Sequence, residues 1–434
     1  MERCKLVQLF FCVAMLQAVR GLSDARLAEY MQESSKEQDW LVGIRRELHQ
    51  WPELMYEEHN TSLFLRKALD DLDIPYKFPA AKTGIVATIG KGDPVVALRT
   101  DIDALPIHEE SDVPFRSKID GKSHACGHDS HMTMLLGGAK LLKKRESELK
   151  GTVKLIFQPA EEGGAGGERM VKEGHLKDVK AIFGFHVWPA SPSGSVLTKA
   201  GTIMGAAAQF NVTVRGRGGH AAMPHTTVDP VVAGAALVTA LQTVIARETD
   251  PLHSQVVSMT RFNTGENAYN VIPDVVKLGA TYRSLTHEGM VRMKKRMYEI
   301  MTSTAAAYGC SAEVDWMEEA HPYYPPTVND PALAAFVKNV GVRVLGDSSR
   351  VKEAIPTLAG EDFSFYSHTA GVPACFTFLG IKDEKLGTTH GLHTPKFKLD
   401  ESVLKLGAAL HAGLATEFLD TYQGGLSDSS RAEL

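Results

Sequence analysis

Cysteine is scarce in this sequence, with 5 residues in 434, and no apolar run reaches a comfortable membrane-spanning length. An apolar run at residues 6–19 follows two basic residues, which is the pattern of a secretory signal peptide. The alternative is a buried N-terminal helix. We expect residues 1–21 to be a signal peptide, whose removal takes two cysteines with it. The three that remain are too few and too far apart for a disulfide framework: Cys126, Cys310 and Cys375.

The chain also lacks an excess of basic charge. It has 47 Lys and Arg residues against 52 Asp and Glu residues and no basic stripe, which argues against nucleic acid as a partner. Internal repeats and low-complexity tracts are absent as well. The hydrophobic content of 44% is ordinary for a soluble globular protein, so we expect no membrane contact after signal removal. A length of 434 residues predicts two domains.

The last four residues, Arg-Ala-Glu-Leu at 431–434, resemble the Lys/His-Asp-Glu-Leu signal that retains proteins in the endoplasmic reticulum. Ala432 stands where that signal has an aspartate. We therefore expect a protein of the endoplasmic reticulum lumen whose retention is weakened. Triplets at Asn60 and Asn211 fit the glycosylation pattern, although such short matches also arise by chance.

A dense group of potential metal ligands occupies residues 123–131, which read Ser-His-Ala-Cys-Gly-His-Asp-Ser-His. Apolar residues at helical spacing follow over residues 132–144, so we expect this group at the N-terminus of a helix. There the helix dipole favours a thiolate at Cys126, and thiolate with imidazole suits Zn, Mn, Co or Ni. The alternative is a polar first turn with a buried structural cysteine.

Short β-rich runs alternate with helical stretches in the first half of the chain, at residues 84–89, 95–99, 153–157 and 181–185. This alternation predicts an α/β fold with a mostly parallel sheet flanked by helices. Such sheets bind ligands at the carboxyl ends of their strands, where several polar side chains are expected: Asp101, Asp103, Glu161, Glu162 and His186. Because side chains alternate along a strand, one of the two glutamates should face the ions and the other the substrate, and the spacing does not say which.

A second acidic group, made of Glu53, Glu57, Glu58 and His59, lies between the two helices expected within residues 24–72. It has the composition of a metal site without ligand spacing, and we interpret it as a solvated turn.

Residues 204–318 have a different pattern from the rest of the chain. Strands are expected at 210–214, 256–262, 276–282 and 312–316, with helices at 230–246 and 288–308. This β-α-β-β-α-β order is that of a ferredoxin-like α+β domain. The α/β pattern then returns. We therefore expect a catalytic domain at 24–203 and 319–422, an inserted domain at 204–318, and a tail at 423–434.

Six motifs together resemble the aminoacylase and carboxypeptidase-like dinuclear metallopeptidases, and most closely the branch with hippurate hydrolase and the plant auxin–amino acid conjugate hydrolases. The motifs are Asp-Ile-Asp-Ala-Leu-Pro (101–106), His-Ala-Cys-Gly-His-Asp (124–129), Gln-Pro-Ala-Glu-Glu-Gly-Gly (158–164), Gly-Phe-His-Val-Trp-Pro (184–189), Gly-Glu-Asp-Phe (360–363) and His-Gly-Leu-His-Thr-Pro (390–395). The resemblance spans residues 40–420 and implies a zinc-exopeptidase-like catalytic domain.

The resemblance implies two divalent metal ions, manganese in preference to zinc. Their ligands would be Cys126, His128, Glu162, His186 and His393. Glu161 would be the general base, and Asp103 would orient a ligand without binding an ion. Cys126 replaces a bridging aspartate, and Asp101 a metal-binding histidine, of relatives outside the branch.

Other residues match the family pattern with weaker implications. His220, on a Gly-rich loop of the inserted domain, would reach a partner subunit's active site and stabilise the oxyanion, which implies a homodimer. Asn270 and Arg283 would bind the substrate carboxylate. The alternative for His220 is an imidazole with no role in the reaction, and the alternative for Arg283 is an exposed charge on a strand. Packing suffices for His131 and His390, and Glu361 and Asp362 are either supporting groups or buried caps.

The implied reaction is hydrolysis of an N-acyl amino acid, a small-molecule substrate, with indole-3-acetyl conjugates as the leading substrates. A general aminoacylase or hippuricase, or a hydrolase of jasmonoyl conjugates, is the alternative enzyme. A non-catalytic binding protein would need a broken ligand set, yet each ligand position is filled here.

Overall fold

The computed structural model describes residues 24–266 and 268–422. The predicted signal peptide at residues 1–21 and the predicted tail with Ala432 lie outside the described residues. Within the described part of the chain, none of the helices has the length and apolar character that crossing a bilayer requires.

The larger sheet has eight strands. In spatial order they are β1 (Tyr76–Ala80), β2 (Gly84–Gly90), β4 (Thr152–Gln158), β3 (Val95–Asp101), β5 (Val179–Pro192), β16 (Ala374–Lys382), β6 (Val196–Thr198) and β15 (Val351–Glu353). The four central strands, β4, β3, β5 and β16, are parallel to one another, and β3 is buried along its whole length. The predicted α/β fold with a mostly parallel sheet is therefore confirmed.

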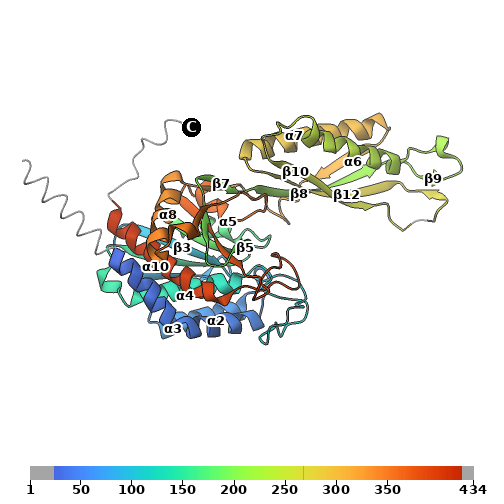
Figure 1. Cartoon of the computed structure of the whole chain (residues 1–434). Helices are drawn as coiled ribbons and strands as arrows, with labels where there is room; N and C mark the ends of the chain where they lie inside the picture. The colour runs from blue at the N-terminus through green and yellow to red at the C-terminus, as the bar shows by residue number, and fades with distance from the viewer. Residues whose placement is uncertain (1–23, 267, 423–434) are drawn as a thin grey trace, which may run out of the picture.

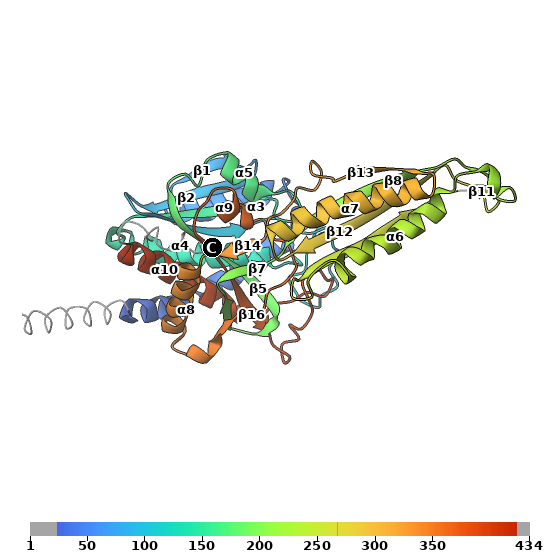
Figure 2. The same cartoon turned by 90° about the horizontal axis from the view of Figure 1, so that it is seen from above.

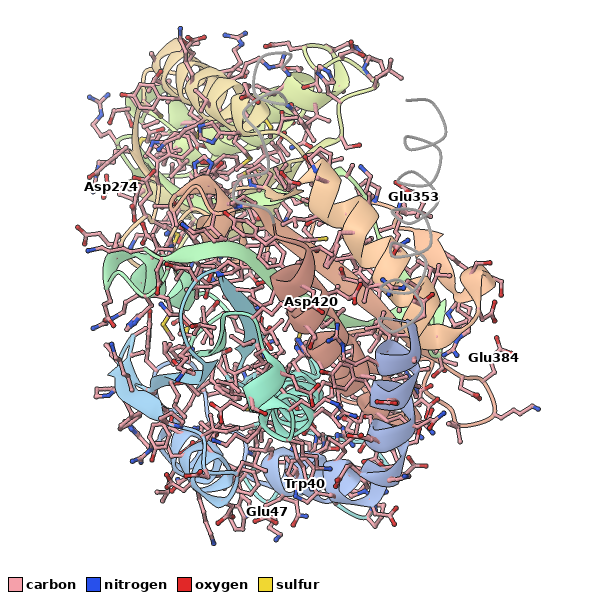
Figure 3. The ribbon with its side chains drawn as sticks, turned by 90° about the vertical axis from the view of Figure 1, so that its left-hand side faces the viewer. Trp40, Glu47, Asp274, Glu353, Glu384 and Asp420 are labelled. Carbon is pink, nitrogen blue, oxygen red and sulfur yellow. The ribbon has the colours of Figure 1, made fainter. Side chains whose placement is uncertain are left out.

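Helices cover both faces of this sheet (Figure 1). One face carries α4 (His128–Lys143), α8 (Pro331–Leu345) and α10 (Leu404–Thr421), with α2 (Gln38–Gln50) and α3 (His59–Asp71) at its side. Figure 3 shows these helices with their side chains, and Trp40 of α2 and Asp420 of α10 mark two of them. A Cβ atom on Gly138 would lie 2.7 Å from the His411 Cβ, so glycine lets α4 pack closely against α10.

The other face carries α5 (Gly166–Lys172) and α9 (Ser364–His368), beside the pair of β7 (Gly201–Met204) and β14 (Thr327–Asn329). Residues 24–36 are also helical. The 3₁₀ turns are η1 (Glu146–Glu148), η2 (Pro224–Thr226), η3 (Ser348–Arg350) and η4 (Glu401–Val403).

The inserted domain has its own antiparallel sheet. Its spatial order is β10 (Gln255–Asn263), β12 (Val275–Ser284), β8 (Ala206–Arg215) and β13 (Ser311–Asp315), with α6 (Pro230–Ala246) and α7 (His287–Ala307) packed on it. This is the predicted ferredoxin-like order. The short strands β9 (Gly219–His220) and β11 (Val271–Ile272) pair at the end of the domain that is far from the large sheet (Figures 1 and 2).

The starts of α6, which was predicted, and of α8 follow directly from local chemistry. Asp229 and Asp330 each accept backbone N–H bonds in the first turn, and Pro230 and Pro331 occupy the next position, where a missing N–H costs nothing. The predicted end of the strand before His186 is wrong, because β5 continues through His186 to Pro192.

Candidate metal centre

The predicted metal ligands gather where α4 begins. Gly127, with φ +88°, precedes the helix, and a Cβ atom there would lie 2.5 Å from the Val187 Cγ2. This left-handed, glycine-only position turns the chain so that Cys126 and His128 both reach the carboxyl edge of the large sheet. The predicted helix N-terminus at this cluster is confirmed.

All five predicted ligands form one cluster. The Cys126 Sγ lies 3.3 Å from the Nε2 atoms of both His186 and His393. The Oε1 of Glu162 lies 3.1 Å from the His393 Nε2 and 3.8 Å from the His128 Nε2. Two groups of three ligand atoms share the cysteine: Cys126, His128 and His186, and Cys126, Glu162 and His393.

Hydrogen bonds fix which atoms face the cluster. His128 donates from Nδ1 to the Asp103 carbonyl at 2.9 Å, and His186 donates from Nδ1 to the Val187 carbonyl at 2.7 Å. Each bond leaves Nε2 as the atom that points inward, as in a typical metal-binding histidine. The Asp103 carboxylate accepts the Glu162 N–H at 2.9 Å, so Asp103 holds two members of the cluster, one through its carbonyl and one through its side chain.

The donor set fits divalent cations. The His128 Nε2 and the Glu162 Oε1 are buried and have no hydrogen-bond partner among the described residues. Such orphaned atoms are costly unless an ion satisfies them. A thiol, imidazoles and a carboxylate are ligands of borderline metals, and Cys126 contacts both halves of the set.

The electrostatics agree with this fit. Burial raises the pKa of the Cys126 thiol, and the carboxylates of Glu162 and Glu161 raise it further. Burial, with the charges of Glu361 and Glu162, likewise raises the pKa of Glu161. Burial disfavours the charged ring of His128, but its neighbouring aspartates outweigh burial and raise its pKa to about 10. Burial and the surrounding acidic groups together raise the pKa values of Cys126 and Glu161, whereas the acidic groups alone raise that of His128, and a bound divalent cation would offset these shifts.

Glu161 and Glu162 lie in a turn after β4, not on a strand, so the predicted strand alternation between them is wrong. The turn nevertheless separates the two side chains. Glu162 joins the ligand cluster, whereas Glu161 lies against it and also approaches Glu361 and Asp362.

The cluster opens into a cavity of about 580 Å³. Its walls include Glu161, the predicted substrate residue Arg283, the aromatic ring of Trp188, and the apolar side chains of Met204 and Leu392. Trp188 stacks on Phe378 with the ring centroids 4.3 Å apart and an angle of 13° between the planes. A volume of this size is typical of small-molecule sites.

His220 and Asn270 lie elsewhere, at the far end of the inserted domain (Figures 1 and 2). β9 and β11 bring them together, because Val271 pairs with His220 and the Ala221 N–H donates to the Asn270 carbonyl at 2.9 Å. Both residues are exposed. Within one chain they do not reach the cavity that Arg283 lines.

The sequence prediction missed a buried arginine behind the cluster. Arg99 donates to Asp101 and Asp362 at 2.9 Å each and lies 3.0 Å from the Glu361 carboxylate. It is an arginine at the end of a run of apolar residues in a central strand, which is a signal that a sequence reading could use. Glu361 and Asp362 are therefore buried charge partners beside Glu161.

The interpretation of residues 53–59 as a solvated turn is wrong for Glu58. This side chain is fully buried, accepts the Ala160 N–H at 2.9 Å and the Thr83 hydroxyl at 2.6 Å, and so supports the turn that carries Glu161. Burial, followed by the charge of Asp103, raises its pKa to about 7.

His131 and His390, for which packing alone was expected, have different environments. His131 donates from Nδ1 to Asp101 at 2.7 Å and accepts the Val187 N–H at Nε2 at 2.9 Å, so it supports the backbone next to His186. His390 is exposed.

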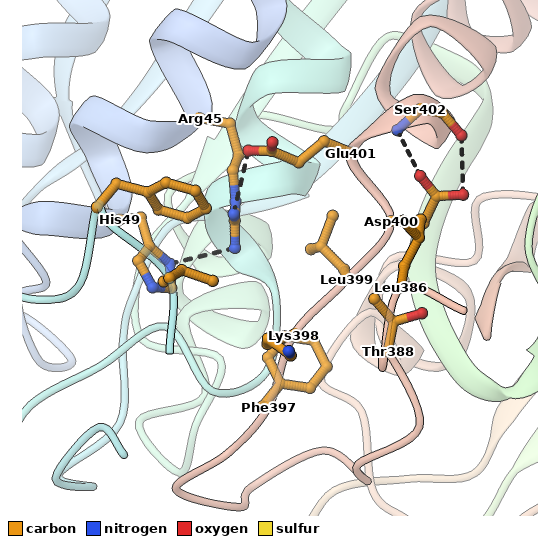
Figure 4. Close-up of a pocket in the computed structure, with 12 residues that line it drawn as sticks. Arg45, His49, Leu386, Thr388, Phe397, Lys398, Leu399, Asp400, Glu401 and Ser402 are labelled. Carbon is orange, nitrogen blue, oxygen red and sulfur yellow. Dashed lines mark hydrogen bonds and ion pairs between the residues drawn. The ribbon is translucent and has the colours of Figure 1, made fainter. Parts of the chain in front are cut away.

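A second cavity, of about 290 Å³, lies between α2 and residues 386–402 (Figure 4). Arg45 donates to Glu401 at 3.2 Å and lies 3.3 Å from the His49 ring, as the dashed lines in Figure 4 mark. His49 bonds Asp129 at 2.7 Å and Glu109 at 3.1 Å. These charged groups pair with one another, so we assign the cavity a structural role.

Comparisons with known proteins agree with this site. The profile of peptidase family M20/M25/M40 matches residues 97–417. The IAA-amino acid hydrolase ILR1-like 4 of Arabidopsis thaliana is 46% identical over 382 residues, which cover 88% of this chain and 86% of that protein.

Two crystal structures are similar over the whole fold. A putative aminohydrolase from methicillin-resistant Staphylococcus aureus has a TM-score of 0.81 at 30% identity, covering 90% of this chain and 100% of that one. The YXEP protein of Bacillus subtilis, described as a dinuclear metal binding peptidase, has a TM-score of 0.76 at 35% identity, covering 89% and 100%. The resemblance found in the motifs is confirmed, and this chain belongs to peptidase family M20/M25/M40.

Proposed function

We propose that this protein hydrolyses the amide bond of N-acyl amino acids and that indole-3-acetyl amino acids are its preferred substrates. The observation that carries the proposal is the five-residue ligand cluster, of which Cys126, Glu162, His186 and His393 line one cavity together with Glu161 and Arg283. The name of the Arabidopsis relative, IAA-amino acid hydrolase, supports the indole acyl group.

The residues that would hold two divalent cations are Cys126, His128, Glu162, His186 and His393, with the cysteine shared. The dinuclear Bacillus relative supports this number of ions. Divalent cations bound there supply Lewis acidity and lower the pKa of a neighbouring water. We propose manganese as the native ion. Metal-free protein reconstituted with manganese should then turn over faster than the same protein reconstituted with zinc.

Glu161 would act as the general base and then as the general acid. Its carboxylate takes the proton of the attacking water and returns it to the amide nitrogen as the amino acid leaves. The raised pKa of Glu161, caused by burial and Glu361, suits a group that must hold this proton between the two steps. Asp103 keeps His128 and the Glu162 backbone in place through the cycle.

Two walls of the cavity would recognise the substrate ends. The guanidinium of Arg283 uses one N–H group to bond the Leu358 carbonyl at 2.8 Å, and a guanidinium can clamp a carboxylate with two others. The ring of Trp188, held in place by stacking on the buried Phe378, offers a flat apolar wall on which a planar indole packs well.

Two matched variants test the chemistry. Glu161→Gln should retain metal and lower turnover by about 10²- to 10⁴-fold, which is the usual loss for a missing general base. Glu162→Gln should instead lose metal affinity. The opposite pattern would exchange the two roles. A comparison of kcat/KM for indole-acetyl, jasmonoyl and benzoyl amino acids tests the substrate, and equal values would favour a general aminoacylase.

We further propose a homodimer in which His220 reaches the partner's cavity. Its exposure at the end of the inserted domain supports this, as does the free edge of β10, because unpaired strand edges seek partners. Mixing His220→Ala with Glu161→Gln should recover part of the activity, since one cavity of the mixed dimer has both residues intact. No recovery in verified mixed dimers would leave His220 without this role.

A further inference from the structure

The turn that carries Glu161 and Glu162 is strained and needs support. Ala160 and Ala165 have φ values of +56° and +49°, and Gly163 has a φ of +109°. Residues with a Cβ rarely adopt this left-handed region, and they stay there only where the surrounding structure holds them.

A single hydroxyl supplies much of that support. The Tyr324 Oη donates to the Glu161 carbonyl at 2.7 Å, and it accepts the N–H groups of Ala165 at 3.0 Å and Gly163 at 3.1 Å. A phenol has one donor and two acceptor sites, so these three bonds use its full capacity. Burial, together with Asp362, keeps the pKa of Tyr324 well above its usual value, and the hydroxyl therefore retains the proton that it donates.

Tyr324 comes from a different part of the fold from the turn that it holds. It lies on the segment by which the chain returns from the inserted domain, 9 residues after the end of β13 at Asp315. Its backbone exchanges two hydrogen bonds of 3.0 Å with Ala207, at the start of β8, where the chain leaves for that domain. The ring packs edge-on against Phe365 with centroids 5.9 Å apart. The tyrosine is thus anchored where the segment that enters the inserted domain pairs with the segment that leaves it.

We propose that Tyr324 is a positioning residue through which this paired segment between the two domains holds the Glu161–Glu162 turn in its reactive geometry. The expected effect of Tyr324 on turnover rests on the proposed amidohydrolase function, whereas its role in holding the turn does not. Other side chains hold other parts of the turn: Glu58 bonds the Ala160 N–H, Asp103 bonds the Glu162 N–H, and Tyr56 bonds the Gly164 carbonyl. Among the described contacts, the Ala165 N–H bonds Tyr324 alone.

The test compares Tyr324→Phe with Tyr323→Phe in the full-length, metal-loaded protein. Both variants lose one hydroxyl and keep the ring. The Tyr323 hydroxyl bonds His287 of the inserted domain at 2.9 Å and does not contact the turn. Tyr324→Phe should lower kcat by about 100-fold with less than about a threefold change in KM, because a misplacement near 1 Å costs about that much. Tyr323→Phe should match the parent protein, and metal content should stay the same in both.

Hydrogen exchange gives a second measurement that does not need activity. Backbone amides in peptides spanning residues 160–166 should exchange faster in Tyr324→Phe than in Tyr323→Phe, since Ala165 loses its acceptor. Unchanged exchange in this turn would overturn the assignment, and so would faster exchange with unchanged kcat. If the parent protein hydrolysed no N-acyl amino acid, the proposed function would fail, while the exchange comparison would still decide whether Tyr324 holds the turn.

Discussion

Replacement of Arg99 by methionine tests how the site tolerates its acidic groups. Arg99 is fully buried, and its guanidinium contacts Asp101, Glu361 and Asp362 within 3.0 Å. Methionine has a similar length and no charge, so the variant leaves three buried carboxylates without their cation. Removing one partner of a buried ion pair costs about 3–5 kcal/mol, and we expect Arg99→Met to lower the free energy of unfolding by at least that amount at pH 7.

The pH dependence of this loss gives a second signature. Burial already raises the pKa values of Glu361 and Asp362, while Arg99 opposes the rise. Without Arg99 both values rise further, so the folded variant binds protons that the unfolded chain has released. Its stability therefore falls as pH increases above the ordinary carboxyl pKa of about 4. The parent protein shares the first part of this fall, because its own two pKa values are raised, so the deficit of the variant grows as pH rises from the folded pKa values of the parent to the higher ones of the variant.

Urea unfolding followed by circular dichroism at several pH values measures both effects. The matched control is Arg46→Met, since Arg46 is 43% exposed in its side chain and pairs with Glu401 at the surface. Such pairs contribute about 0–1 kcal/mol. An Arg99→Met deficit as small as that of the control, or one that does not grow with pH, would refute the idea that Arg99 neutralises these carboxylates.

Three further predictions follow. Cys126→Ser should lose bound metal and activity together, because a neutral hydroxyl is a poor ligand, and full metal content in the purified variant would contradict this. Burial and Arg45 oppose the charge on His49, but Asp129 and Glu109 outweigh them and raise its pKa. Its stabilising contribution is thus complete below about pH 6.5 and is lost as pH rises through the folded value, so urea midpoints should show a larger cost of His49→Gln at pH 5.5 than at pH 9. A fusion with both chain ends should enter the secretory pathway, and Ala432→Asp should increase its retention, as cell fractionation can measure.

The meeting of Asp101, Cys126 and His128 could be predicted from local features, whereas the division of these residues into ligands and supporting groups came from the motif resemblance. Asp101 ends a central parallel strand, and Cys126 and His128 flank the start of a helix, so topology alone brings them to one edge. The ferredoxin-like insert was predictable for a similar reason, since its element order appears in the hydrophobic pattern.

Residues that support the site from a distance could not be predicted in this way. Glu58 lies among charged residues in the sequence, which is typical of an exposed turn. It is buried because it packs against the turn at Ala160, about a hundred positions later. Tyr324 is one of two adjacent tyrosines, and only the tertiary fold decides which of them reaches Glu161. His220 carries no local signal of its remote position, which depends on how the inserted domain extends from the large sheet.

The environment of Asp101 explains why the ligand cluster lies on one side of His128. Asp101, His128 and His131 are also close enough to form a metal group. However, one Asp101 oxygen accepts from His131 and the other from Arg99, and the second nitrogen of His131 accepts the Val187 N–H. An ion there would have to displace these buried bonds, each of which is costly to leave unmade. The unsatisfied Nε2 of His128 is therefore left to the side of Cys126 and Glu162, and in the proposed metal centre Asp101 would support the ligands without competing for an ion.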